Sequence, residues 1–312
     1  MNDTTSANRE PQDEDHDLDL RDGLLPIREV TRQTGVNAVT LRAWERRYGL
    51  IVPHRTPKGH RLYTRAHVQR VLNILIWLDR GVSVGQVKQL LDARQPAAHP
   101  PSDDWLALRA NLVDAIECQA ERRLDDLVNQ AMSLYPPRTL NEQLLSPLLA
   151  ELGRRWQGQF GAQLERAFFH AWLRSKLGAR LYHNNRTVTG APVLLVNHSD
   201  LPMDPHLWLT AWLISSNDCP VEVFDISLPP DELALACGNL SARALVLYAS
   251  KSLTVSQLPR LLTKVECPVV LAGPAVTIHR EQLSGQRFGI ERLLLAENPI
   301  DAHQRLLHAG VI

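Results

Sequence analysis

The sequence has few of the features that mark secreted, membrane-spanning or metal-binding chains. Its longest apolar run, 71–78, is too short to cross a bilayer. The acidic N-terminal segment lacks the apolar core of a secretory signal. Four cysteines lie far apart without paired spacing, which argues against a disulfide framework or a cysteine-based metal site (Cys118, Cys219, Cys237, Cys267). We therefore expect a cytoplasmic protein that contacts no membrane.

A net charge is also absent, but the total of zero hides an asymmetry along the chain. Residues 1–25 carry eight acidic residues and two arginines, whereas residues 26–94 carry thirteen Lys and Arg and four acidic residues. A basic block inside a neutral chain indicates one module that binds a polyanion. The overall composition, 44% hydrophobic and 22% charged, is typical of a globular protein, and 312 residues predict two or three domains.

Short motifs of common enzymes are missing as well. The chain contains none of the patterns G-x-G-x-x-G, G-x-x-x-x-G-K-[ST] and H-E-x-x-H, which mark dinucleotide, phosphate and zinc sites. We therefore predict that the protein is not an enzyme and has neither a catalytic residue nor a metal site.

The basic block has the pattern of a winged helix-turn-helix. Pro26 opens a short helix over 27–33, and a second helix spans 38–48 with one apolar face. A turn-rich basic segment, 53–61, then leads into a short strand, and two more helices are expected over 66–78 and 83–91. The acid-rich residues before this block, 1–25, predict a disordered tail because they have no apolar periodicity.

The rest of the chain predicts two further domains. A proline-rich linker, 95–101, cannot continue a helix. Residues 102–186 contain four segments with one apolar stripe each, which favours a four-helix bundle, with Thr139 and Glu142 as a capping box for the third helix. Strands and helices alternate over 191–312, which predicts a flavodoxin-like, doubly wound parallel sheet of about five strands. The expected fold is therefore multidomain, α and α/β.

The second helix of the basic block has the features of a DNA-recognition helix. Arg42 and Arg46 are four residues apart and share one face, opposite the apolar face of Leu41, Trp44 and Tyr48. Guanidinium groups on such a face can reach guanine edges or phosphates in a major groove. The basic segment that follows suits phosphate contacts (Arg55, Lys58, Arg61).

These residues resemble the MerR-type DNA-binding domain. The resemblance covers residues 26–92 and rests on the runs Thr40-Leu41-Arg42-Ala43-Trp44-Glu45-Arg46-Arg47-Tyr48-Gly49-Leu50 and Gly59-His60-Arg61-Leu62-Tyr63. It implies a homodimeric regulator that bends and untwists double-stranded promoter DNA used by RNA polymerase. It also implies base and phosphate contacts from seven residues (Thr40, Arg42, Arg46, Arg55, Lys58, Arg61, Tyr63). Leu41 and Trp44 are expected to pack inside the domain.

A helical bundle followed by a flavodoxin-like domain is similar to the cobalamin-binding pair of light- and B12-responsive MerR-type regulators. Trp156 and Glu165 fit the bundle motif of that pair, but Arg166 stands where the motif has histidine. The cobalt-ligand motif, Asp/Glu-x-His-x-x-Gly, would place its histidine at Met203 or at His206, and neither reading is followed by the required Gly. The candidate ligand pocket therefore comprises Trp156, Glu165, Met203 and His206, and we predict no cofactor, with adenosylcobalamin as the alternative.

The whole chain is similar to the biofilm and curli branch of MerR regulators, the MlrA-like proteins, through Val39–Leu50 and Leu207–Leu213. That branch likewise lacks the cobalt-ligand motif, and it implies input from a nucleotide second messenger or a signalling protein. The prediction is a transcriptional regulator whose C-terminal sensory or interaction domain has lost cobalamin. The alternatives are a cobalamin-dependent regulator and, from another class, a corrinoid-dependent enzyme. The promoter, the sign of regulation and the signal are not encoded in any motif.

Overall fold

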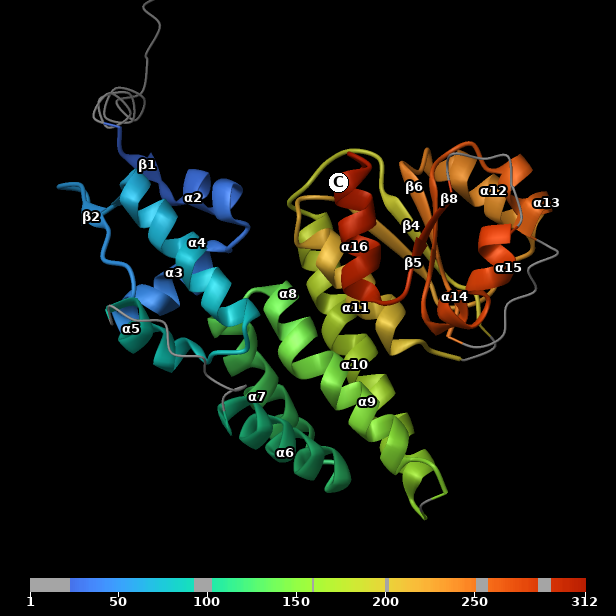
Figure 1. The fold of residues 1–312 in the computed structure, drawn as a ribbon, viewed down its shortest axis with the longest axis horizontal. Coiled ribbons are helices and arrows are strands. Elements are labelled where there is room, and N and C mark those ends of the chain that lie inside the picture. The colour runs from blue at the N-terminus through green and yellow to red at the C-terminus, as the bar shows by residue number, and fades with distance from the viewer. Residues whose placement is uncertain (1–22, 93–102, 159, 200–201, 251–257, 286–292) are drawn as a thin grey trace, which may run out of the picture. The chain divides into compact units, whose positions relative to one another are not determined.

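The computed structural model describes residues 23–92, 103–158, 160–199, 202–250, 258–285 and 293–312 (Figure 1). The predicted acidic tail up to residue 22 and the predicted linker, 95–101, lie outside the described residues. The chain forms two compact units, one of residues up to 107 together with 128–136, and one of residues 108–127 together with 137–312. The sequence-based domain boundaries stay predictions.

In the first unit, two short helices form the predicted helix-turn-helix. Helix α2 (Ile27–Thr34) ends at Gly35, whose φ of 71° is a left-handed conformation that glycine adopts without strain. Helix α3 (Ala38–Ala43) begins at Asn37, whose side chain accepts a hydrogen bond from the backbone N–H of Thr40 at 2.8 Å. The helix continues as the π-helical turn η1 (Trp44–Tyr48) and ends at Gly49.

A small sheet and two helices complete the predicted winged domain. Strands β1 (Leu25–Pro26), β3 (Arg61–Tyr63) and β2 (His54–Arg55) are antiparallel and lie in that order. Helix α4 (Arg65–Asp79) starts with a capping box between Thr64 and His67, and helix α5 (Val84–Asp92) follows it. The wing is therefore the β2–β3 hairpin, as predicted.

The four predicted helical segments of the middle region are present. They are α6 (Asp103–Glu117), α7 (Glu121–Leu134), the run α8 (Pro137–Leu140), η2 (Asn141–Leu145) and α9 (Ser146–Arg155), and α10 (Ala162–Asn185). One detail of the prediction is wrong. The third segment begins at Pro137, so Thr139 lies inside a helix and is buried instead of capping it.

The C-terminal part of the second unit is the predicted doubly wound sheet. Its strands are β4 (Val193–Asn197), β5 (Val221–Phe224), β6 (Ala244–Tyr248), β7 (Val269–Ala272) and β8 (Leu293–Ala296). All pairs are parallel and the order is β5-β4-β6-β7-β8. Because the order reverses at β4, the carboxyl ends of β4 and β6 flank the crevice where doubly wound folds bind ligands.

Helices cover both faces of this sheet. They are α11 (Pro205–Ser215), α12 (Pro230–Leu240), α13 (Leu258–Lys264), α14 (Pro274–Ile278), α15 (Arg280–Gly285) and α16 (Pro299–His308). In Figure 1, α11 and α16 lie on one side of the strands and α12 and α13 on the other. The alternation of strands and helices that the sequence predicts for 191–312 is therefore present. Among the described residues, no helix is long and apolar enough to span a bilayer.

Candidate nucleic-acid interface and ligand pocket

The predicted recognition helix presents its two arginines to solvent. Arg42 in α3 and Arg46 in η1 are exposed, while Leu41 and Trp44 are 1% and 0% exposed and belong to the core. The expected separation into a packing face and a cationic face is therefore present. Trp44 and Leu41 pack inside the domain, as predicted.

Glu45 joins the recognition helix to the wing. Its Oε1 accepts a hydrogen bond from Nη2 of Arg55 at 2.7 Å, and its Oε2 accepts one from Nε of Arg61 at 2.5 Å. Partial burial raises the pKa of Glu45, but the hydrogen bonds from Arg61 and Arg55 outweigh this effect, so the pKa lies below its ordinary value. The carboxylate is therefore ionised at neutral pH and holds both wing arginines beside the helix.

Two of the seven residues predicted to contact DNA are buried. Thr40 and Tyr63 are 0% and 1% exposed, so neither side chain forms part of the molecular surface. Burial raises the pKa of Tyr63, and Glu45 raises it further, while Arg61, Arg42 and Arg55 lower it. Arg42 of the helix and Arg55 and Arg61 of the wing therefore all act electrostatically on the same hydroxyl. We call Arg42, Arg46, Arg55, Lys58 and Arg61 the basic face.

In the second unit, the residues of the predicted bundle motif are in contact. The indole N–H of Trp156 donates to Oε2 of Glu165 at 3.0 Å, and both side chains are buried. The guanidinium of Arg166 lies 5.3 Å from the centre of the Trp156 ring, on its face. Arg166 therefore covers the tryptophan at the position where the cobalamin-binding motif has histidine.

A histidine outside the predicted ligand pocket, His170, lies beside Trp156. The His170 ring is 5.7 Å from the Trp156 ring and nearly perpendicular to it. Burial lowers the pKa of His170 to about 4, with a further contribution from Arg166, so the ring is neutral at pH 7. His170 also interacts electrostatically with Asp204 and His206. Its position, one helical turn after Arg166, is the sequence signal that would have revealed it.

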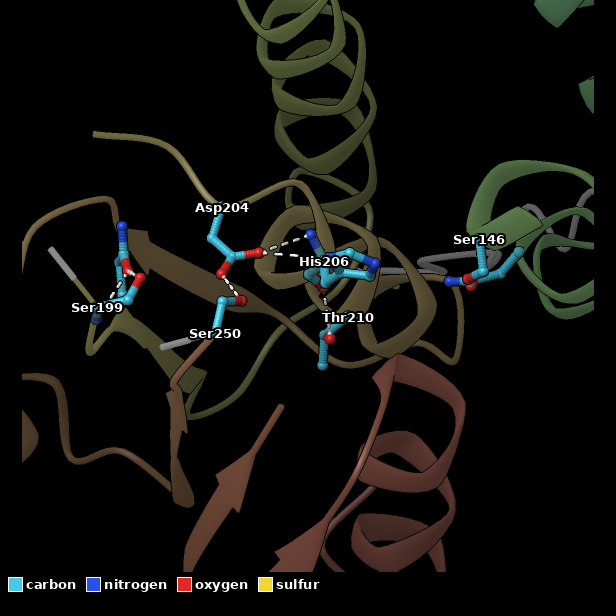
Figure 2. Close-up of polar contacts among 8 residues, drawn as sticks. Ser146, Ser199, Asp204, His206, Thr210 and Ser250 are labelled. Carbon is cyan, nitrogen blue, oxygen red and sulfur yellow. Dashed lines mark hydrogen bonds and ion pairs between the residues drawn. The ribbon is translucent and has the colours of Figure 1, made fainter. Parts of the chain in front are cut away.

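Asp204 organises the start of α11. Figure 2 shows its carboxylate accepting hydrogen bonds from the backbone N–H of His206, at 2.9 Å, and from the hydroxyl of Ser250. Burial raises the pKa of Asp204, but the hydrogen bonds from His206 and Ser250 outweigh it, and the pKa lies below its ordinary value. The carboxylate thus caps α11 and ties it to the chain after β6.

His206 stacks on the protein itself. Its ring lies parallel to the Tyr248 ring, at an interplanar angle of 3° and a centroid distance of 6.2 Å. The side chain of His206 is 34% exposed, whereas Met203 is buried. The structure therefore groups Trp156 with Glu165 and puts the His170 ring beside Trp156, while the Met203 side chain is buried.

Two bulky, buried residues of α11 stand at and beside the position where the cobalt-ligand motif requires glycine. Leu209 is 0% exposed at that position. The Trp208 ring packs on Gly178 of α10, so that a Cβ added at Gly178 would lie 3.7 Å from Cζ3 of the indole. The indole N–H of Trp208 donates to Oδ1 of Asp225 at 2.7 Å, and Arg174 pairs with the same carboxylate. This packing joins α10, α11 and the end of β5.

A cavity of about 270 Å³ lies elsewhere in the second unit. None of the four predicted pocket residues lines it; its walls come from the ends of β4 and β5 and from α12 and α13 (His198, Ser227, Leu228, Pro229, Pro230, Leu233, Leu258, Leu261). Within the described ranges, no group of three or more His, Cys, Asp or Glu side chains could hold a metal ion.

Comparison with known proteins tests these assignments. The family model of the MerR HTH regulatory proteins matches residues 25–94, and a B12 binding domain model matches residues 108–181. The HTH-type transcriptional regulator MlrA of Salmonella typhimurium is 30% identical over 239 residues, which cover 77% of this chain and 93% of that protein. The chain belongs to the MerR family. The predicted likeness to MlrA and the predicted fold class are thereby confirmed.

Two further transcriptional regulators and one solved structure are also similar to this chain. MlrA of Escherichia coli is 29% identical over 66% of this chain and 81% of its own. The HTH-type transcriptional repressor CarH of Myxococcus xanthus is 29% identical over 39% of this chain and 44% of its own. Among solved structures, the monomethylamine corrinoid protein of Methanosarcina barkeri covers 65% of this chain and 96% of its own, at 16% identity and a TM-score of 0.46.

One serine of the MerR-type regulator invites comparison with hydrolases. Residues 81–85 spell G-x-S-x-G, the pattern of a nucleophile elbow, with Ser83 at its centre. A nucleophile elbow connects a strand to a helix, but this segment connects α4 to α5, and Ser83 is 3% exposed. The pattern is therefore a helix–helix turn, consistent with relatives that are transcriptional regulators.

Proposed function

We propose that this MerR-type regulator binds and distorts promoter DNA through the basic face. The observation that carries the proposal is the pair of hydrogen bonds by which the Glu45 carboxylate holds Arg55 and Arg61 beside the recognition helix. On that helix, the side chains of Arg42 and Arg46 are exposed to solvent. Arginines fixed in this way lose little side-chain entropy when they meet phosphates. Thr40 and Tyr63 are left out of the proposed contact because they are buried.

The proposed division of labour follows from the geometry of the side chains. Arg42 and Arg46 lie on one helix, which suits a major groove, and Arg55, Lys58 and Arg61 lie on the hairpin, which suits the flanking backbone. We propose that the protein acts as a homodimer, with RNA polymerase as its partner at the promoter. Contacts of this kind allow bending to supply part of the specificity, because deformation energy depends on sequence.

We also propose that the C-terminal domain holds no cobalamin. Three observations support this. Leu209 is buried at the position of the motif glycine and Trp208 beside it packs on Gly178, Asp204 is engaged in the cap of α11, and Arg166 covers Trp156. A corrin would have to displace packed apolar side chains, at a cost of several kcal/mol. The domain would instead act as a sensory or docking module for a nucleotide second messenger or a signalling protein.

Two measurements test these proposals independently. Binding of the full-length protein to its promoter, found by genome-wide mapping, should weaken steeply with salt, by about one unit of log–log slope for each phosphate neutralised. A protein that ignores every duplex at low ionic strength contradicts the DNA-binding proposal. Incubation with adenosylcobalamin followed by gel filtration should leave no corrin absorbance with the protein. A stoichiometric corrin spectrum contradicts the second proposal and favours the cobalamin-dependent alternative.

The sensory and docking roles are distinguished by what raises the melting temperature. A small-molecule sensor should be stabilised by its ligand according to the ratio of ligand concentration to Kd, by about 2.7 kcal/mol at a hundredfold excess over Kd. A docking module should show no such shift with cyclic or linear dinucleotides but should retain a signalling protein in a pull-down with the purified candidate.

A further inference from the structure

The recognition helix is attached to the end of α7 by a buried hydrogen bond. Trp44 stands between Arg42 and Arg46 in the sequence. Its indole N–H donates to the carbonyl oxygen of Leu134 at 2.7 Å. The indole is fully buried while both arginines are exposed, so the anchor and the cationic side lie on different faces of the helix. A rotation of the helix about its axis would move the arginines and the indole together and would break this bond.

The carbonyl of Leu134 takes a donor from a distant segment because of the residues around it. Leu134 is the last residue of α7, and the last carbonyls of a helix have no donor within the helix. Pro136 and Pro137, the second and third residues after it, have no N–H that could close a turn onto this carbonyl. The indole of Trp44 therefore pairs a group that the neighbouring backbone leaves open.

A second bond connects α7 to the other end of the recognition helix, through α5. The hydroxyl of Tyr135 accepts the backbone N–H of Val84 at 3.3 Å, and Val84 is the first residue of α5, where backbone N–H groups have no partner within the helix. The next residue, Gly85, lies against Tyr48, since a Cβ at Gly85 would be 3.8 Å from Cε1 of the tyrosine ring. Tyr48 is the last residue of η1 and Trp44 is its first, so both ends of this turn are held.

Tyr135 is itself fixed by packing. Its ring centroid lies 4.4 Å from that of Trp105 in α6, and both side chains are buried. Burial raises the pKa of Tyr135 to about 12, so the hydroxyl is neutral at pH 7. The residues of α7 belong to both compact units, 121–127 to the second and 128–134 to the first. The helix that ends at the recognition helix is therefore continuous with the second unit.

We propose that Leu134 and Tyr135 are positioning residues, which set the orientation in which the recognition helix presents Arg42 and Arg46 to DNA. This inference rests on the proposed DNA-binding function. Base contacts depend on the orientation of a recognition helix, whereas phosphate contacts by long cationic side chains depend mainly on charge. The end of α7 therefore governs the discrimination between the promoter and other DNA, and an event in the second unit that displaces α7 changes that discrimination.

The test compares Tyr135→Phe with the wild type in the full-length chain. The variant keeps the ring against Trp105 and removes the acceptor of the Val84 N–H. Fluorescence anisotropy measures the affinity for a labelled promoter duplex and for a scrambled duplex of the same length and composition. Affinity for the promoter should fall by about three- to tenfold, the effect of one hydrogen bond, while affinity for the scrambled duplex stays the same. Tyr182→Phe is the matched control and should change neither affinity, because Tyr182 is exposed on α10.

A second measurement needs no substitution. Because coupling between two sites is reciprocal, the promoter duplex should slow hydrogen exchange of the backbone amides at 128–134 in the wild type, and the scrambled duplex should slow it less. The positioning role is overturned by an unchanged ratio of the two affinities in Tyr135→Phe, or by exchange at 128–134 that the promoter leaves unaltered. A wild-type protein that binds no duplex contradicts the proposed function instead, and with it the role of Leu134.

Discussion

Trp44 donates its indole N–H to the backbone carbonyl oxygen of Leu134, in a buried hydrogen bond of 2.7 Å between residues ninety positions apart. A second bond lies beside it, because the hydroxyl of Tyr135 accepts the backbone N–H of Val84 at 3.3 Å. Both bonds lie inside the first compact unit. The end of α7 is therefore a structural part of the helix-turn-helix unit, although it is far from that unit in sequence.

The Trp44 bond predicts a stability effect. Trp44→Phe removes the donor and leaves the buried carbonyl of Leu134 unpaired, so the free energy of unfolding should fall by about 1–3 kcal/mol. Urea unfolding followed by circular dichroism measures it. The control is Trp77→Phe, because Trp77 is half-buried on α4 with its ring beneath the Arg80 guanidinium. Equal losses in the two variants would show that the Trp44 bond contributes nothing specific.

Arg42 predicts an effect on affinity without an effect on stability. Because its side chain is exposed, Arg42→Ala should leave the melting temperature unchanged and weaken specific promoter binding by about 1–3 kcal/mol. Arg122→Ala is the matched control, since Arg122 is an exposed arginine on α7 and its loss changes the net charge equally. Fluorescence anisotropy with labelled promoter duplex checks both. A footprint in Arg42→Ala that matches the wild type would remove Arg42 from the basic face.

His303 predicts a pH-dependent loss of stability. Burial lowers its pKa to about 4, and Arg138 lowers it further, so the folded chain keeps the ring neutral where the unfolded chain protonates it. The stabilisation is complete above the ordinary pKa of about 6.5 and is lost as the pH falls through about 4. Between these values, His303→Gln should reduce the slope of unfolding free energy against pH by about 1.4 kcal/mol per pH unit.

The measurement is a series of urea titrations between about pH 4.5 and 6. In this range one buried histidine contributes its full effect to the slope of unfolding free energy against pH. His308→Gln provides the control, because His308 is exposed on the same helix, α16. If both variants keep the wild-type slope, the buried ring of His303 does not govern the acid sensitivity of the protein.

Two glycines predict opposite outcomes for the same substitution. Gly273 has a φ of 107°, and a Cβ there would lie 2.5 Å from the carbonyl oxygen of Ala249, so Gly273→Ala should destabilise the protein by more than about 2 kcal/mol. Gly178 is helical and its Cβ would make an ordinary contact with Trp208, so Gly178→Ala should be neutral or stabilise α10 by up to about 1 kcal/mol. Differential scanning calorimetry compares them. A stable Gly273→Ala protein would contradict the close approach of β7 to the chain after β6.

The helices and strands were largely predictable because their signals are local. Apolar spacing, Asn37 and Gly35 at helix ends, and the continuous apolar runs of the parallel strands need no tertiary information. Thr139 shows the limit of local signals, since its capping pattern is real in the sequence but Pro137 starts the helix earlier. The cationic face was predictable for the same reason, because the i, i+4 spacing of Arg42 and Arg46 fixes their common side.

The candidate site was less predictable because it depends on residues that meet from distant segments. The spacing of His170 one turn after Arg166 is visible in the sequence, but its electrostatic interactions with Asp204 and His206 are not, because those residues come from a distant segment. Thr40 and Tyr63 have the residue types of phosphate contacts, yet packing buries them. Glu45 gave no signal at all, since nothing in its local sequence shows that two wing arginines return to it.

The sequence by itself determined the family, the order of the elements and the cationic side of the recognition helix, since each of these depends on residues close together in the chain. Only the tertiary structure decided that Glu45 holds the wing, that α7 ends against Trp44, and that Trp208 packs on Gly178 of α10. The physical reason is that long-range packing places side chains by shape and burial, and residue spacing along the chain carries no record of it.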